Sequence, residues 1–255
     1  MSVVASELIV YGAQNIAETD GVTQGGAIDE TVRYVFDDST LANTLNDTLE
    51  VLSDNAGDTT QTVTVTGRNS AGSIITENFS LNGTTVQNGA TTFERILKVV
   101  MSATAVGNVT VRKAADDTAV ATLEPGVTSV RRPFYDVSSD AAGGSSRDFY
   151  EKVFVKNTNA SNALLNAVIK ENADSLSKIT FDLEDAQNDN ESIASRLNTP
   201  PTGLSSGVFN DADKPVPGTD LGTSSQIGVW LKLTLAAGDA ANKGTWTMQI
   251  DGSTT

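Results

Sequence analysis

The sequence contains neither histidine nor cysteine, and only 5% of its 255 residues are aromatic. Histidine is the side chain that most readily transfers protons near neutral pH, and cysteine and histidine are the usual activated nucleophiles and soft-metal ligands. Any catalysis would therefore rest on carboxylates, hydroxyls, lysines and arginines alone. We expect a structural or binding protein rather than an enzyme, with no cofactor, no metal and no catalytic residues.

Basic residues are also scarce, since 17 Lys and Arg stand against 32 Asp and Glu, for a formal net charge of -15. Neutralising phosphates requires clustered Lys and Arg, so we expect no nucleic-acid partner and no binding to anionic membranes. An acidic surface suits a partner with basic patches. The sequence has no apolar run of transmembrane length and no signal-peptide layout at its start, so we expect synthesis in the cytoplasm without processing.

The apolar residues occur in short alternating bursts, a pattern typical of half-buried strands. The clearest pair is 60–66 and 73–81, in which Val63 and Val65 lie on one face and threonines on the other. Comparable hairpins are predicted for 108–112 with 119–123, 149–156 with 163–170, and 229–235 with 246–250. With 38% hydrophobic residues available for a core, the sequence predicts an all-β fold of two β-sandwich domains, Ig-like or jelly-roll-like.

We place the domains at 1–124 and 125–255. The N-terminal domain is expected to carry a Gly-rich arm at 12–29, and we expect this arm and the turn-rich loop 203–220 to reach partner chains. Residues 138–146 are small and polar and indicate a flexible connection. One short helix is predicted over 189–197, because Ile193 and Leu197 would lie on the same side and Asp189 or Asn190 would cap it.

Carboxylates are the abundant reactive groups. Asp182 and Glu184 would share one face of a strand, as the paired acids of a glycosidase can. Such enzymes line a sugar cleft with aromatic side chains, whereas the neighbourhood here offers only Phe181. We therefore interpret the pair as part of a solvated face or an acidic cluster. Ser205 lies in a Gly-x-Ser-x-Gly pattern, but the motif lies in a turn-rich loop and no histidine is available to complete a triad.

Calcium is a further possibility that the sequence leaves open. The run Asp185, Asn188, Asp189, Asn190 and Glu191 has suitable oxygen donors, although it lacks the interior glycine and the spacing of an EF-hand loop. The loops 18–21 and 210–213 contain similar clusters. Ordinary turn chemistry explains all three.

Three residues are candidates for protein contacts. Arg131 and Arg132 can pair with an acidic neighbouring chain or form a salt bridge at the domain junction. Trp230 alternates with the stripe of Val229, Leu231 and Leu233 and so faces away from it. The indole therefore packs under the other domain or marks a contact with another protein.

Three stretches carry a resemblance to a known class of proteins. They are 6–29 (SELIVYGAQNIAETDGVTQGGAID), 62–103 (TVTVTGRNSAGSIITENFSLNGTTVQNGATTFERILKVVMSA) and 216–252 (VPGTDLGTSSQIGVWLKLTLAAGDAANKGTWTMQIDG). Together they resemble structural proteins of tailed-bacteriophage virions, most closely capsid decoration (cement) proteins. The resemblance implies a non-enzymatic protein that binds the outside of the capsid lattice. It also implies two partners: the major capsid protein and further copies of the chain itself, since such proteins are commonly oligomers, often trimers.

Two alternatives remain. The first is a tail, neck or fibre-base protein of the same virion. The second is an adhesin-like module that binds glycans, which would predict a secretion signal and an exposed aromatic platform, neither of which is visible in the sequence.

Overall fold

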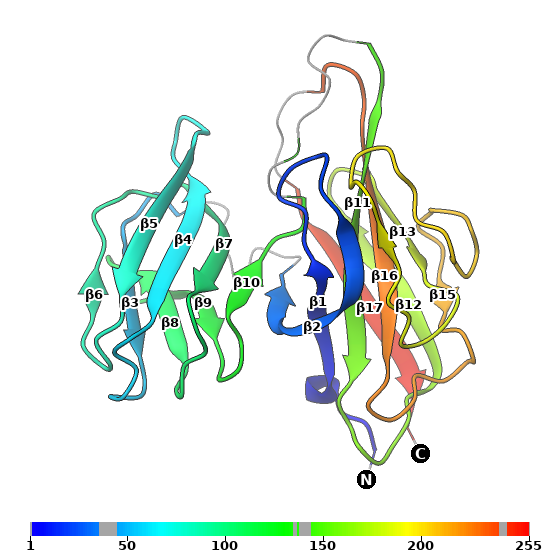
Figure 1. Cartoon of the computed structure of the whole chain (residues 1–255), viewed down its shortest axis with the longest axis horizontal. Coiled ribbons are helices and arrows are strands. Elements are labelled where there is room, and N and C mark those ends of the chain that lie inside the picture. Colours follow the sequence, from blue (N-terminus) through cyan, green and yellow to red (C-terminus); the bar gives the residue numbers. More distant parts are fainter. Residues whose placement is uncertain (1, 36–44, 135–136, 138–143, 240–243, 255) are drawn as a thin grey trace. The chain divides into compact units, whose positions relative to one another are not determined.

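The computed structural model describes residues 2–35, 45–134, 137, 144–239 and 244–254, and Figure 1 traces the chain. Strands make up nearly all of the regular structure, and the helical element of the described residues is the single 3-10 turn η1 (Ala5–Glu7). The prediction of an all-β fold of the sandwich type is confirmed. Residues 138–143 of the expected flexible connection lie outside the described residues.

The chain divides into two compact units whose limits differ from the expected domains. Unit 1 comprises Met1–Asp29 and Phe134–Thr255, and unit 2 comprises Glu30–Pro133. The N-terminal segment thus belongs with the C-terminal half of the chain instead of with residues up to 124. The reason is strand pairing: β1 (Leu8–Asn15) hydrogen-bonds along β11 (Arg147–Asn157), from Leu8 opposite Asn157 to Gly12 opposite Val153.

Unit 2 is a sandwich of two sheets. One sheet has the order β10-β7-β4-β5, with the last residues of β2 (Gln24–Tyr34) beside β10, and the other has the order β6-β3-β8-β9. Its strands are β3 (Leu49–Ser53), β4 (Thr62–Arg68), β5 (Ile74–Ser80), β6 (Gln87–Asn88), β7 (Arg95–Met101), β8 (Val109–Lys113), β9 (Ala119–Leu123) and β10 (Ser129–Arg131). Val63 and Val65 are buried in one continuous apolar core with residues of both sheets.

Unit 1 contains a larger sheet with the order β13-β16-β11-β1 followed by the first residues of β2, to which β14 (Ser192–Ile193) also pairs. A three-stranded sheet has the order β15-β12-β17. The remaining strands are β12 (Leu165–Asp174), β13 (Ile179–Leu183), β15 (Lys214–Pro215), β16 (Gln226–Leu235) and β17 (Trp246–Ser253). The rings of Phe181 and Trp246 meet edge to face at 6.1 Å between the two sheets.

Two predicted hairpins are confirmed and two are wrong. Strands β4 and β5 pair antiparallel, with Val63 opposite Phe79, and β8 pairs with β9. By contrast, β11 pairs with β1 and β16, whereas β12 pairs with β15 and β17. The predicted hairpin partners therefore lie in different sheets. Alternation shows that a strand has one buried face, but a strand that crosses to the opposite sheet of a sandwich has the same alternation.

The expected arm and helix are also corrected. Residues 12–29 are largely β1 and β2, in which Gly12 pairs with Val153 and Gly25 with Ser192. Residues 189–197 form no helix: they contain β14, and Leu197 makes an isolated bridge with Phe149. Hydrogen bonds to the sheet replace the helical ones, so tertiary pairing prevails over the local apolar spacing.

Candidate functional site

The larger sheet of unit 1 has one face that carries charge. Asp182, Trp230 and Lys152 are register partners across β13, β16 and β11. Successive side chains of a strand point to opposite faces, so these three lie on the face opposite the apolar stripe of Leu231 and Val229. The predicted orientation of Trp230 follows from the same alternation.

The chain from Glu184 to Asn210 covers this face. It is attached to the sheet by β14, by a bridge between Glu184 and Leu204, and by a bridge between Phe181 and Asn210. Trp230 is fully buried beneath it in a cluster with Tyr150, Ile193, Leu204 and Phe209. The structure therefore places Trp230 in the core of unit 1, and its side chain is not available at the surface for a partner.

Lys152 and Glu184 form a buried ion pair on this face, and neither side chain has exposed surface. The ammonium also donates to the backbone carbonyls of Glu191 at 3.0 Å and Gly26 at 3.3 Å. Burial lowers the pKa of Lys152, against the effect of the neighbouring carboxylates, and burial raises the pKa of Glu184 to about 7, against the effect of the Lys152 ammonium. Burial disfavours the charged form of each group, and the charge of its partner favours it.

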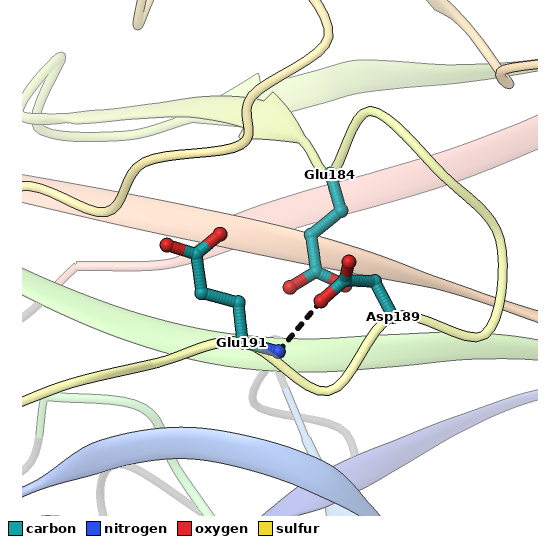
Figure 2. Close-up of side chains that lie close together, drawn as sticks. All are labelled: Glu184, Asp189 and Glu191. Atoms are coloured by element: carbon teal, nitrogen blue, oxygen red, sulfur yellow. Dashed lines mark hydrogen bonds between the residues drawn. The ribbon is translucent and has the colours of Figure 1, made fainter.

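Two further carboxylates, those of Asp189 and Glu191, lie beside Glu184 (Figure 2). One oxygen of each of the three groups lies within 4.8 Å of the others. The Glu191 amide donates to Asp189 Oδ1 at 2.6 Å, and the Glu191 carboxylate accepts the Thr202 amide at 3.2 Å. Carboxylate oxygens at this spacing are the kind that calcium takes in proteins.

The composition of this cluster differs from the run considered in the sequence. Glu184 joins from the end of β13, whereas Asp185 donates its amide to the carbonyl of Gly203 and the Asn188 side chain accepts the Gln226 amide. The spacing of Glu184, Asp189 and Glu191 along the chain did not indicate that they form one cluster. They come together because the covering segment folds back over the sheet, where Leu204 bridges to Glu184.

Gly25 sets how closely β2 approaches the covering segment. Its φ is +94°, and a Cβ at this position would lie 2.8 Å from both the Glu191 carbonyl oxygen and Trp230 Cη2. Only glycine adopts this backbone region without strain and leaves room for both neighbours. The close approach lets the Gly26 carbonyl reach the Lys152 ammonium.

Asp182 and Glu184, considered above as a catalytic pair, belong to separate ion pairs. Asp182 Oδ1 lies 3.7 Å from Lys214 Nζ and accepts the Ser205 hydroxyl at 3.4 Å, while its Oδ2 accepts the Val208 amide at 3.2 Å. Both carboxylates have no exposed surface. In this arrangement a substrate reaches neither carboxylate. The hydrogen bond from Ser205 to Asp182 orders the loop that carries Ser205.

The structure buries the two candidate arginines of unit 2. Arg131 ends β10 and is 5% exposed, and Arg132 is 8% exposed. The Arg132 amide donates to the Leu97 carbonyl at 3.0 Å, and its Nε donates to the Ile96 carbonyl at 3.3 Å. Both arginines belong to unit 2, whereas Trp230 belongs to unit 1.

Sequence reasoning missed three buried cations of the described residues, Lys152, Arg196 and Lys214. Arg196 Nη1 donates to the Ala17 carbonyl at 2.9 Å, and its Nη2 lies 3.2 Å from Asp20 Oδ1. The one available signal was the position of Lys152 directly before the apolar run Val153-Phe154-Val155. Its acidic partner is 32 residues away in the sequence, so pairing required the fold.

Comparisons with known proteins identify no family. No protein-family model and no curated protein matches the chain. A solved structure described as "Chaperone-tip adhesin complex is vital for synergistic activation of CFA/I fimbriae biogenesis" aligns at 9% identity over 93% of each chain, with a TM-score of 0.20, which is too low to indicate a shared fold. Among the described residues, no helix has the length and hydrophobicity needed to cross a membrane.

Proposed function

We propose that this chain is a structural protein of a tailed-bacteriophage virion, a capsid decoration protein that binds the outside of the major capsid lattice and acts through contact. The observation that supports this most is the distribution of charge. Among the described residues the buried basic side chains are Arg131, Arg132, Lys152, Arg196 and Lys214, against the buried acids Asp58, Glu151, Asp182 and Glu184. The buried charges of the described residues therefore nearly cancel, and the acidic excess of this part of the chain lies on exposed and half-buried side chains.

An acidic surface of this kind favours association with a basic protein surface and disfavours nucleic acid and anionic lipid. The proposal requires a basic patch on the major capsid protein, which the lattice would repeat in many identical copies. Weak contacts repeated by symmetry then give firm attachment to the particle.

The buried reactive groups support a structural role as well. Lys152 and Glu184 hold the covering segment to the sheet, and Asp182 orders the loop of Ser205 and Val208. Rigid sandwich units with internally paired charges suit a protein that reinforces a shell.

The described surface also offers apolar contact points in place of the expected arm at 12–29. Five large hydrophobic side chains of the described residues are exposed: Val4, Val22, Ile74, Val106 and Val208. Val106 is 71% exposed on a loop whose amides are fixed by the buried carboxylate of Asp58. A fixed loop loses little conformational entropy when it binds.

The test is sedimentation of the purified chain with capsids of its own phage that lack it. We expect saturable binding at a fixed ratio to the major capsid protein, and binding that weakens as NaCl rises from about 50 to about 500 mM. Val106→Ser is expected to weaken binding, whereas Ala115→Ser, at an exposed position in the turn between β8 and β9, serves as a surface control. Binding to isolated tails but not to capsids would replace the decoration role by a tail or neck role, and binding to neither would overturn the proposal.

A further inference from the structure

We propose that Lys152 is a tethered cation: its ammonium takes the place of a divalent metal ion among the carboxylates of Glu184, Asp189 and Glu191 and so fastens the covering segment to the sheet without metal. The inference concerns how unit 1 is built and does not depend on the proposed function.

The surroundings of the ammonium are those of a bound cation. Its ion pair and hydrogen bonds are to oxygen atoms: the Glu184 carboxylate and the backbone carbonyls of Glu191 and Gly26. The ring centroid of Phe154 lies 4.7 Å from the ammonium. Carboxylate and carbonyl oxygens are also the ligands of calcium sites. The lysine stem supplies the cation from β11, beneath the segment that carries the acids.

The groups that face the ammonium come from several elements of unit 1. Glu184 extends from the end of β13, and Asp189 and Glu191 extend from the covering segment (Figure 2). β16 contributes the neutral indole of Trp230, whose ring centroid lies 5.6 Å from the ammonium. Asp182 lies on the same face but is 3.7 Å from its own cation, Lys214. The Glu184 carboxylate thus pairs with the ammonium, and the negative charges of Asp189 and Glu191 also act on it.

The contacts of the ammonium join three separate parts of unit 1. Lys152 belongs to β11, Gly26 belongs to β2, and Glu184 and Glu191 belong to the first part of the covering segment. β2 and the covering segment are also bonded directly, since the Gly26 amide donates to the Glu191 carbonyl at 2.8 Å. Removing the ammonium leaves three carboxylates close together, and their repulsion pushes the covering segment away from the sheet.

The test is the response to calcium of Lys152→Ala, which removes the cation and leaves space among the carboxylates. Both tryptophans of the chain, Trp230 and Trp246, lie in unit 1, so their fluorescence reports the melting of that unit. Wild type, Lys152→Ala and the double variant Lys152→Ala/Glu184→Gln are melted with CaCl2 or with NaCl of equal ionic strength. The double variant has the same space but one carboxylate fewer.

We expect Lys152→Ala to melt below wild type and to regain at least about 3 °C at about 10 mM CaCl2, saturably. The wild type and the double variant are expected to change by less than about 1 °C. If Lys152→Ala is unfolded without metal, calcium is expected to restore its folded fluorescence. Two results would overturn the inference: a saturable rise in the wild type, which would show that the acids bind metal with Lys152 present, or no calcium response in Lys152→Ala.

Discussion

Lys152 and Glu184 form an ion pair from which water is excluded, with no exposed surface on either side chain. Removing two charges from water costs several kcal/mol per ion, and their attraction offsets this cost only while both are present. The pair therefore makes each partner indispensable to the other. It contributes to the specificity of the arrangement more than to the free energy of unfolding.

Removing one partner is expected to be worse than removing both. Glu184→Gln and Lys152→Met should each lower the free energy of unfolding of unit 1 by about 3 to 5 kcal/mol, because each leaves an uncompensated buried charge. The double variant Lys152→Met/Glu184→Gln should lose much less than the sum of the two. Urea unfolding followed by tryptophan fluorescence gives the three values, and a coupling energy near zero would contradict the description of the pair.

Glu184 gives unit 1 a distinctive dependence on pH. Its pKa is 4.5 in an ordinary carboxyl and about 7 in the folded chain, because of burial. Between these values the folded state binds more protons than the unfolded state, so this group's contribution to stability is greatest below pH 4.5 and falls as pH rises to about 7. Other carboxylates, such as Asp251 beside Lys170, have lowered pKa values and act in the opposite direction.

The difference between two proteins isolates the contribution of Glu184. The free energy of unfolding of the wild type minus that of Glu184→Gln should decrease as pH rises from about 4.5 to about 7, since the glutamine does not titrate. Measurement of both proteins by urea unfolding across this range supplies the curve. A difference that increases with pH would show that the carboxyl has a lowered pKa instead.

Gly25 is expected to tolerate no side chain. Gly25→Ala should lower the free energy of unfolding by about 1 to 3 kcal/mol, because it combines a positive φ with overlap against the Glu191 carbonyl and the Trp230 ring. Gly21→Ala is the matched control, since no atom lies within 4 Å of its added Cβ. Trp230 fluorescence should also change in the first variant alone, and equal effects from both substitutions would refute the close-packing explanation.

Unit 2 has a comparable anchor in Asp58. Its carboxylate accepts the Ser53 hydroxyl at 2.7 Å and the amides of Val106 and Gly107 at 2.9 and 3.0 Å, and these bonds, that of Ser53 first, lower its pKa. Asp58→Asn should cost about 1.5 to 3 kcal/mol, because the uncharged amide group cannot accept all three bonds.

The readout is hydrogen exchange at the Val106 and Gly107 amides, which should lose protection in Asp58→Asn. Asp116→Asn changes an exposed carboxylate paired with Lys113 and should leave those amides unchanged. Retained protection in Asp58→Asn would show that the loop is held by other contacts.

The sequence predicted the fold class because alternation of apolar residues is a local property. Val63 and Val65 showed a buried face, and that face is in the core. Which strands pair is not local: β11 and β12 alternate as hairpin arms would, yet they belong to different sheets. The difference between the expected domain limits and the two compact units has the same origin, since the pairing of Leu8 with Asn157 joins the N-terminal segment to the second half of the chain.

The candidate site was less predictable than the fold. The orientation of Trp230 could be predicted from its position in the strand. Its burial could not, because it depends on the covering segment. Lys152 lies on β11 and Glu184 follows β13, and the sheet places only β16 between these two strands. The covering segment then folds back over the same face of the sheet. No spacing in the sequence encodes that return.

The most direct measurement of the proposed role is a cryo-EM map of the assembled particle. The chain is expected on the outer face of the icosahedral shell, in contact with the major capsid protein and with further copies of itself. Density for the chain in the tail alone, or particles from which it is absent, would contradict the role of a capsid decoration protein.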